Sequence, residues 1–203
     1  MPRLYLASNN AHKATELTAL LATLLPPWEV QLARDLAPGI TWDEVGDSFL
    51  ANARIKAEAL RAHTGACVLA DDSGLVVDVL GGAPGVHSSR YAGVDGDDLA
   101  NNAKLAAAIK SYAEHDLSAR FVCTLYFIDE SGQGHEFSGV LEGQLTHSAR
   151  GRHGFGYDPL FVPKLSDPAW QGRTLAEIPA SVKNQISHRA LAFAALEQWL
   201  AKR

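Results

Sequence analysis

The sequence predicts an α/β fold in which helices flank a mixed, twisted sheet. Short apolar runs typical of strands alternate irregularly with stretches of helical periodicity. No fixed-period repeat, low-complexity tract or long linker divides the chain. The 203 residues are 47% hydrophobic and 20% charged, a composition ample for a packed core. We therefore expect one domain over residues 1–203, large enough to be bilobed.

The first part of the chain is predicted to contain a strand, a polar loop and two helices. Residues 4–7 are apolar, as in a short buried strand. Leucines then recur at helical spacing over residues 17–24, until two prolines end the helix. A second helix begins after a cap at Asp47 or Ser48, and it ends at Gly65.

Two short strands are expected next, over residues 66–70 and 75–80. Turn-forming residues separate them, in the order Asp71-Asp72-Ser73-Gly74. This pattern predicts that two adjacent carboxylates lie at the end of a strand.

The remaining elements are a helix, a hairpin, a short strand and a last helix. The helix covers about residues 99–114, and the hairpin pairs residues 119–128 with 136–145. A loop at residues 154–158 leads into the short strand, and the last helix follows Ser187. Three aspartates before the first of these helices are expected to cap it, namely Asp95, Asp97 and Asp98.

Composition also excludes several classes of function. The formal charge is −5 and the sequence pI is about 5.9, which argues against a nucleic-acid partner. The longest strongly apolar run, residues 121–128, is too short to span a membrane, and no secretory signal opens the sequence. We therefore expect no membrane association and a cytoplasmic location. Cys67 and Cys123 lie in apolar runs and are expected to be buried free thiols.

The first candidate site is the segment Ser8-Asn9-Asn10-Ala11-His12-Lys13, between the first strand and the first helix. Backbone N–H groups and the helix dipole attract anions at such a place, and Lys13 adds a positive charge. A phosphate is the ligand that these features favour. Taken alone, the segment is better explained as a surface lysine after an asparagine cap, because it lacks a glycine-rich phosphate loop.

The second candidate site is acidic. Asp71 and Asp72 offer the oxygen ligands that Mg²⁺ prefers, and one of them could activate a water. Glu44 lies just before the second helix, on which Asn52 and Lys56 share one face. A carboxylate, an amide and a lysine at one rim suit a polyphosphate bound with Mg²⁺. An ordinary Asx turn and a solvated helix face explain the same residues taken singly.

The third candidate site is aromatic and basic. The run Gly154-Phe155-Gly156-Tyr157-Asp158-Pro159 presents two aromatic rings and a carboxylate in a loop, and such rings stack on bases. Ser187-His188-Arg189 could donate hydrogen bonds to a keto oxygen, which predicts a preference for 6-oxopurines over adenine. A buried turn anchored by Phe155 and surface ion pairs on a helix end are the alternatives.

Together these segments resemble the inosine triphosphate pyrophosphatase family, which removes ITP, dITP and XTP. The likeness runs from Ala7 to Arg189. It rests on five ordered motifs: Ser8-x-Asn10-x-x-Lys13, Asp71-Asp72-Ser73-Gly74-Leu75, Gly81-Gly82-Ala83-Pro84-Gly85-Val86 through Arg90-Tyr91-Ala92-Gly93, Phe155-Gly156-Tyr157-Asp158-Pro159 and Ser187-His188-Arg189.

The resemblance implies a homodimer of two-lobed α/β subunits, each with the nucleotide in a central cleft, and a requirement for Mg²⁺. It implies that a purine nucleoside triphosphate is cleaved to the monophosphate and pyrophosphate. Asp72 would be the general base, and Glu44 and Asp72 would lie near the metal. The implied substrate contacts are Ser8, Asn9, Asn10, Ala11, His12, Lys13, Lys56 and Ser73 for the phosphates, and Phe155, Gly156, Tyr157, Asp158, Lys183, His188 and Arg189 for the base and remaining phosphate contacts.

The sequence departs from the family pattern before Lys183, where it lacks the acidic residues common in relatives. The resemblance therefore supports the role of Lys183 less strongly than the other roles. Two other functions stay open. One is a pyrophosphatase for modified pyrimidine or methylated nucleotides, against which His188 and Arg189 argue. The other is a nucleotide-sensing module without turnover, against which the paired Asp71 and Asp72 argue.

Overall fold

The computed structural model of the chain describes residues 3–8, 11–24, 28–36, 40–112 and 115–202, without the side chains of residues 11–14, 22–24 and 34. The chain forms two compact units. Unit 1 comprises residues 1–72, 123–139 and 189–203, and unit 2 comprises residues 73–122 and 140–188.

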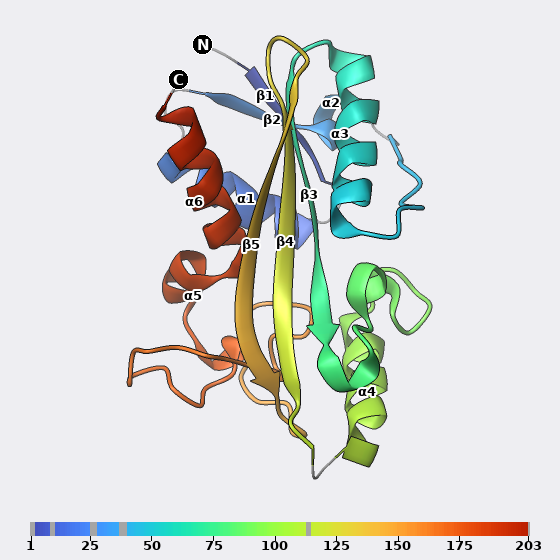
Figure 1. The fold of residues 1–203 in the computed structure, drawn as a ribbon, viewed down its shortest axis with the longest axis vertical. Helices are drawn as coiled ribbons and strands as arrows, with labels where there is room; N and C mark the ends of the chain where they lie inside the picture. Colours follow the sequence, from blue (N-terminus) through green and yellow to red (C-terminus); the bar gives the residue numbers. More distant parts are fainter. Residues whose placement is uncertain (1–2, 9–10, 25–27, 37–39, 113–114, 203) are drawn as a thin grey trace. The chain divides into compact units, whose positions relative to one another are not determined.

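A six-stranded mixed sheet is the central element (Figure 1). Strand β1 pairs in parallel with β2 on one side and with β3 on the other, whereas β5 and β6 are antiparallel. The predicted α/β fold with a mixed sheet flanked by helices is therefore confirmed. In sheet order the strands are β2 (Glu29–Leu32), β1 (Arg3–Ala7), β3 (Cys67–Val77), β4 (Ser118–Ile128), β5 (Gly134–Leu145) and β6 (Phe161–Pro163).

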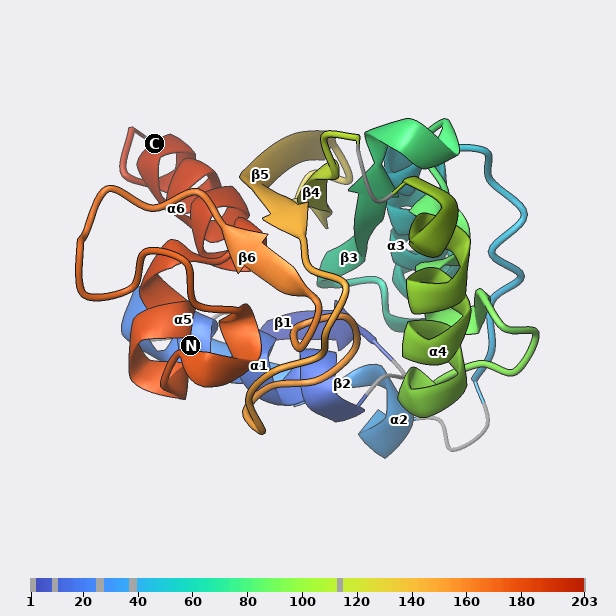
Figure 2. The same ribbon diagram turned by 90° about the horizontal axis from the view of Figure 1, so that it is seen from below.

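In unit 1 both faces of the sheet are covered, as expected for parallel strands. Leu4 and Leu6 of β1 pack in a cluster with leucines of α1 (Ala11–Leu24) and with Phe193 of α6 (His188–Leu200). Tyr5 and Ala7 of the same strand pack in a second cluster, with side chains of α3 (Phe49–Thr64) and α2 (Ala33–Leu36). Accordingly, α6 and α3 lie on opposite sides of the strands (Figures 1 and 2).

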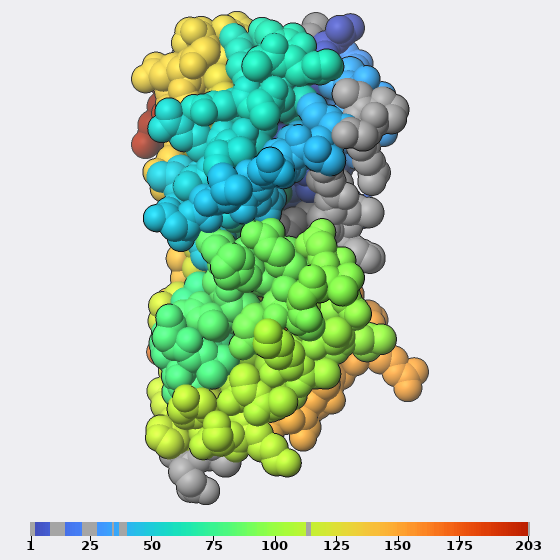
Figure 3. Space-filling view, turned by 90° about the vertical axis from the view of Figure 1, so that its right-hand side faces the viewer, coloured from blue at the N-terminus to red at the C-terminus, as the bar shows by residue number. Residues whose placement is uncertain are grey.

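Helix α3 has the boundaries that its sequence predicts. The Ser48 hydroxyl accepts a hydrogen bond from the backbone N–H of Ala51 at 3.2 Å, so serine is the N-cap. Gly65 ends the helix with φ +65°, a conformation that glycine adopts without strain. Helix α3, coloured cyan to teal in Figure 3, forms part of the surface of unit 1.

Unit 2 has its own core. Leu105 and Ile109 of α4 (Asp98–Ile109) pack against Leu75 and Val77 of β3, together with Phe161 of β6. Helix α5 (Ala180–Ile186) and α4 lie on opposite sides of the strands (Figures 1 and 2). Short 3₁₀ turns complete the unit at Asp78–Leu80, Gly85–Arg90, Lys110–Tyr112 and Leu175–Glu177.

The prediction of two short strands around the paired aspartates is wrong. Strand β3 continues through Asp71 and Asp72 to Val77, and residues 78–80 form a 3₁₀ turn. The register explains this, because β1 pairs with β3 only as far as Ala70. The turn-forming residues therefore mark the point where pairing between β1 and β3 ends, although β3 itself continues.

Other boundaries differ less. Helix α4 ends at Ile109 and passes into a 3₁₀ turn, while residues 113–114 lie outside the described residues. Asp97 is its cap, accepting from the backbone N–H of Ala100 at 3.0 Å, whereas Asp98 has a different role. The predicted last helix is confirmed as α6, but the sequence patterns did not predict β2, α2 or α5.

Cys67 and Cys123 are buried free thiols, as expected. Among the described residues, no helix combines the length and apolar character required to cross a membrane.

Candidate active site

The paired aspartates lie where the ladder between β1 and β3 ends. Ala7 pairs with Ala70, so Ser8 and Asp71 follow at the same edge of the sheet. All three polar residues at this edge are buried: Ser8 is 4% exposed, Asp71 1% and Asp72 4%. Successive residues of a strand point to opposite faces, which directs Asp71 and Asp72 to different sides of β3.

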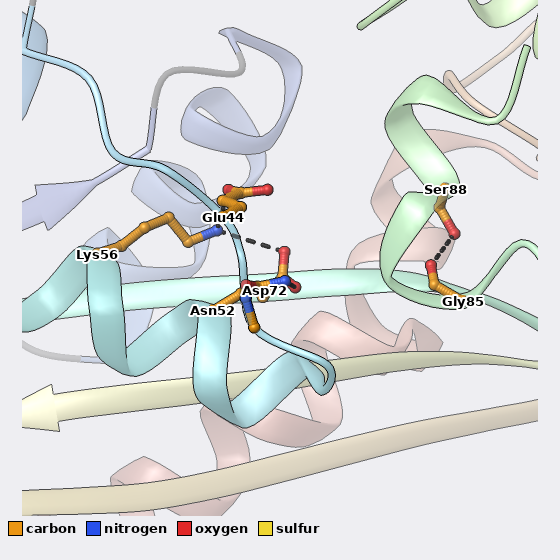
Figure 4. A network of polar contacts seen from close by, with 7 residues as sticks. Glu44, Asn52, Lys56, Asp72, Gly85 and Ser88 are labelled. Atoms are coloured by element: carbon orange, nitrogen blue, oxygen red, sulfur yellow. Dashed lines mark hydrogen bonds and ion pairs between the residues drawn. The ribbon is translucent and has the colours of Figure 1, made fainter. Parts of the chain in front are cut away.

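Asp72 points toward helix α3, where two side chains contact it (Figure 4). The Lys56 ammonium donates to Asp72 Oδ1 at 3.3 Å, and the Asn52 amide donates to Asp72 Oδ2 at 3.2 Å. Asn52 is itself held in place, because its Oδ1 accepts from the backbone N–H of Gly46 at 2.8 Å. The convergence predicted for Asn52 and Lys56 on one helix face is therefore confirmed.

Lys56 also bonds Glu44, at 2.9 Å between Nζ and Oε1. Burial lowers the pKa of the Lys56 ammonium, but the carboxylates of Asp72, Asp71 and Glu44 together outweigh burial and raise that pKa above its ordinary value. Lys56 is thus a buried, permanently charged cation at neutral pH, and it compensates the negative charge around it.

Glu44, Asp71 and Asp72 form a carboxylate cluster near Lys56, in which Glu44 and Asp72 have the donor chemistry of a hard-cation site. Carboxylate oxygens of Glu44 and Asp72 already converge on one positive group, the Lys56 ammonium. Oxygen donors of this kind fit Mg²⁺, which also keeps several waters. Within the described part of the chain, no set of three or more His, Cys, Asp or Glu residues is arranged as a complete metal site, so waters or a ligand would have to supply further coordination.

The predicted anion-binding segment is only partly described. Asn9 and Asn10 lie outside the described residues, while Ala11, His12 and Lys13 form the first turn of α1, with their side chains outside the description. Arg189 of α6 lies near this helix, because its guanidinium donates to Glu16 Oε2 at 2.9 Å. In unit 1, therefore, Arg189 is bonded to helix α1, which begins within the Ser8–Lys13 segment.

In unit 2, the aromatic loop is built around Asp158. Its carboxylate accepts from the backbone N–H of Phe155 at 2.9 Å and from the Lys183 ammonium at 2.5 Å. The same ammonium lies 4.8 Å from the centre of the Phe155 ring, within the range of a cation–π contact. Asp158 and Lys183 are therefore the buried support of this loop, and Phe155, half-buried, is its ring nearest to solvent.

Glycine is required at the start of this loop. Gly154 has φ +75°, and a Cβ there would lie 1.9 Å from the Asp158 carboxylate oxygen. The close approach of the backbone to Asp158 is what brings the Phe155 N–H within hydrogen-bonding distance of that carboxylate.

Tyr157 is not presented by the loop, contrary to the sequence-based expectation of two presented rings. It is only 3% exposed, and its hydroxyl donates to the backbone oxygen of Ser88 at 2.8 Å. Burial, with the charges of Tyr91 and Asp98 adding to it, raises the pKa of Tyr157, so the phenol stays neutral and remains a donor. Ser88 is fixed in turn by donating to the Gly85 oxygen at 2.6 Å (Figure 4).

Helix α4 holds the same loop through two side chains one turn apart. Asp98 Oδ2 accepts from the backbone N–H of Gly156, and Asn102 Nδ2 donates to the backbone oxygen of Gly156, both at 2.7 Å. Asp98 was predicted from the sequence as a helix cap, whereas Asn102 was not among the predicted site residues. The signal available in the sequence is their spacing of four on one helix, which places both side chains on the same face.

The remaining predicted residues have these positions. His188, 2% exposed, stacks on Phe121 with ring centres 4.8 Å apart and an interplanar angle of 10° in unit 2. Ser73 is half-buried in β3. His188 therefore stacks on Phe121 in unit 2, whereas Arg189 bonds Glu16 in unit 1, although the two residues are consecutive.

Comparison with known proteins identifies the family. The sequence model of the Ham1 family matches residues 4–199. The chain belongs to the Ham1 family. A Streptomyces coelicolor protein named dITP/XTP pyrophosphatase is 45% identical over 197 residues, which cover 97% of this chain and 96% of that protein. A Geobacter sulfurreducens protein of the same name is 42% identical over 200 residues, covering 98% and 97%.

Solved Ham1 structures share the fold. The structure of a HAM1 protein from Coxiella burnetii has a TM-score of 0.85 and 37% sequence identity, and the match covers all of both chains. The resemblance drawn from the five motifs is therefore confirmed, and the polar network around Asp72 belongs to a Ham1-family chain.

Proposed function

We propose that this Ham1-family protein hydrolyses non-standard purine nucleoside triphosphates, such as ITP, dITP and XTP, to the monophosphate and pyrophosphate. The observation that carries the proposal is the buried Asp72 carboxylate, held by Lys56 and Asn52 beside Glu44. The names of the full-length relatives, dITP/XTP pyrophosphatase, support the choice of substrate.

Asp72 is proposed as the general base that takes a proton from the attacking water. Its contacts with Lys56 and Asn52 fix the direction of the carboxylate, and a fixed base is a large part of such catalysis. Lys56 and Lys13 are proposed to bind the triphosphate, with the Ser8–Lys13 backbone and Ser73 as further phosphate contacts. Positioning and charge neutralisation supply most of the rate enhancement in phosphoryl transfer.

Glu44 and Asp72 are proposed to hold Mg²⁺, because their oxygens already share one cation. When bound, the metal would supply positive charge to the phosphoryl oxygens. Lys13 and Lys56 would add positive charge near the phosphates. The negative charges of Glu44 and Asp72 would offset the repulsion between these lysines and the metal.

The purine base of the substrate is proposed to stack on the Phe155 ring. Lys183 and Asp158 support that ring, and Gly156 and Tyr157 complete the loop. His188 and Arg189 are proposed to favour a 6-oxo group. An adenine amino group would leave a buried donor without an acceptor, which is a strong basis for rejection. We also propose that the protein works as a cytoplasmic homodimer, on the basis of the family resemblance.

A product assay tests the reaction and its substrate together. Purified protein with Mg²⁺ is expected to convert ITP and XTP to monophosphate plus pyrophosphate, and to convert ATP far more slowly. Omission of divalent cation with EDTA should abolish turnover. Release of orthophosphate and diphosphate would contradict the proposed bond cleavage, whereas equal rates with ITP and ATP would remove the argument for 6-oxopurines. Faster turnover of a modified UTP would favour the pyrimidine alternative.

Asn102→Ala tests the support of the aromatic loop. The substitution removes the hydrogen bond to the Gly156 oxygen and leaves the carboxylate cluster unchanged. We expect KM for ITP to rise about five- to tenfold, as for one lost hydrogen bond, with kcat changing less than twofold. Steady-state kinetics measures both values. The neighbouring variant Asn101→Ala is unsuitable as a control, because the Asn101 side chain bonds the backbone of Ser89 and of Ala92. Lys110→Ala, exposed beyond the end of the same helix, is the control. A fall in kcat at unchanged KM would contradict the role in substrate binding.

A further inference from the structure

Unit 1 contains a cavity of about 350 Å³ that shares no residue with the carboxylate cluster. Its volume lies within the range of small-molecule sites. The cavity is formed by the residue before β2, the start of β3, the end of β4, the turn between β4 and β5, and the end of α6. The lining residues are Trp28, Cys67, Phe127, Asp129, Glu130, Ser131, Gln133, Trp199 and Leu200.

Three aromatic rings dominate the apolar part of this cavity. Trp28 and Phe127 meet edge to face with centres 6.3 Å apart, and Phe127 and Trp199 do so at 6.0 Å. The planes are inclined by 71° and 74°, so the three rings do not lie flat on one another. In each pair the edge of one ring meets the face of the other, and any ring face left uncovered at the cavity could contact a cation.

The polar part of the cavity is negative. Asp129 is held rigidly, since its carboxylate accepts from the Ser131 hydroxyl at 2.6 Å and lies 2.9 Å from His135 Nε2. Glu130 is exposed at the rim. The carboxyl end of α6, at Leu200, adds the negative end of a helix dipole.

Burial is the main reason why the pKa of the Cys67 thiol is raised. The negative charges of Glu130 and Asp129 raise it further, whereas the positive charge of Arg61 lowers it. Arg61 donates to the backbone oxygen of Glu130 at 3.2 Å.

We propose that this cavity binds a small organic cation, an alkylated ammonium of the size of choline. The aromatic rings would contact the alkyl groups and the charge, and the Glu130 and Asp129 carboxylates would favour the positive ligand over a neutral one of the same shape. The site is independent of the proposed hydrolase reaction.

Choline and its neutral carbon isostere, 3,3-dimethylbutan-1-ol, separate charge recognition from simple apolar binding. Titration of the intact protein is followed by calorimetry and by tryptophan fluorescence, because Trp28 and Trp199 line the cavity. We expect saturable choline binding and at least about fivefold weaker binding of the alcohol, the difference that a cation–π contact supports. Absence of saturable choline binding, or equal affinities for the two compounds, would overturn the proposal.

Two variants locate the binding. Glu130→Gln should weaken choline binding severalfold and leave binding of the alcohol unchanged, whereas Glu136→Gln, an exposed acid outside the lining, should change neither. Trp28→Leu should abolish choline binding in protein that retains its thermal unfolding midpoint. Undiminished choline binding by Glu130→Gln would refute the charge argument even if the Trp28 variant failed to fold.

Discussion

Asp72→Asn is expected to lower the rate of pyrophosphate release from ITP by about 10²–10⁴-fold, the usual contribution of a positioned general base. The amide has the shape of the carboxylate and can keep one contact to Lys56, but it cannot accept a proton from water. Nucleotide binding should persist, because Lys56 and the aromatic loop are unchanged. Stopped assays give the rate, and calorimetry with ITP in Ca²⁺ gives the affinity.

Asp43→Asn is the matched control, since Asp43 is the exposed neighbour of Glu44. It should retain at least half of the wild-type rate. Near-normal turnover by the Asp72 variant would exclude this residue as the base, and loss of turnover in both variants would indicate a general effect of charge. A wild-type protein that binds ITP without releasing pyrophosphate would favour the nucleotide-sensing alternative.

Lys56→Met is expected to lower the free energy of unfolding by about 3–5 kcal/mol at pH 8, because it leaves buried carboxylates without their cation. The methionine fills much of the same volume, so packing changes little. Without the ammonium, the buried negative charge at this site has no compensating cation, and taking up a proton there removes that cost. The loss of stability should therefore shrink as pH falls.

In the wild-type protein, the raised pKa of Lys56 determines how its contribution to stability changes with pH. The raised pKa of Lys56 means that its contribution is present below the unfolded-state value of about 10.4 and is lost as pH rises through the higher folded-state value. Urea unfolding at several pH values measures both effects. Arg54→Met is the control on the same helix, because its pair with Glu58 is exposed and should contribute less than about 1 kcal/mol. A pH-independent loss in the Lys56 variant would contradict the electrostatic explanation.

The sequence predicted those elements whose signals are local. Helix α3 has a serine cap, an apolar stripe and a terminal glycine within its own residues, and its boundaries were correct. The turn-forming residues at Asp71 and Asp72 were misleading because strand continuation depends on a neighbouring strand, which no local pattern reports. Strand β2 and helices α2 and α5 are short, and short elements carry few periods from which to detect a pattern.

At the site, too, local signals in the sequence were sufficient for some residues, whereas others depend on contacts with distant segments. Asn52 and Lys56 were predicted to converge, because a spacing of four on a helix fixes the shared face. The partners of Asp158, Tyr157 and Arg189 come from segments far away along the chain, at Lys183, Ser88 and Glu16, and their pairing depends on the tertiary fold. Consequently the chemical types at the site were predictable, whereas the division between residues that face a ligand and residues that support them was not.

The position of α6 has a consequence for how the protein is made. This helix packs on the face of β1 that bears Leu4 and Leu6, yet it follows all of unit 2 along the chain. During translation, the part of this apolar face that α1 does not cover stays exposed until residues 189–200 leave the ribosome, and long-range closure of this kind slows folding. Nascent chains stalled before that point should recruit chaperones, and release of the final helix should end the association.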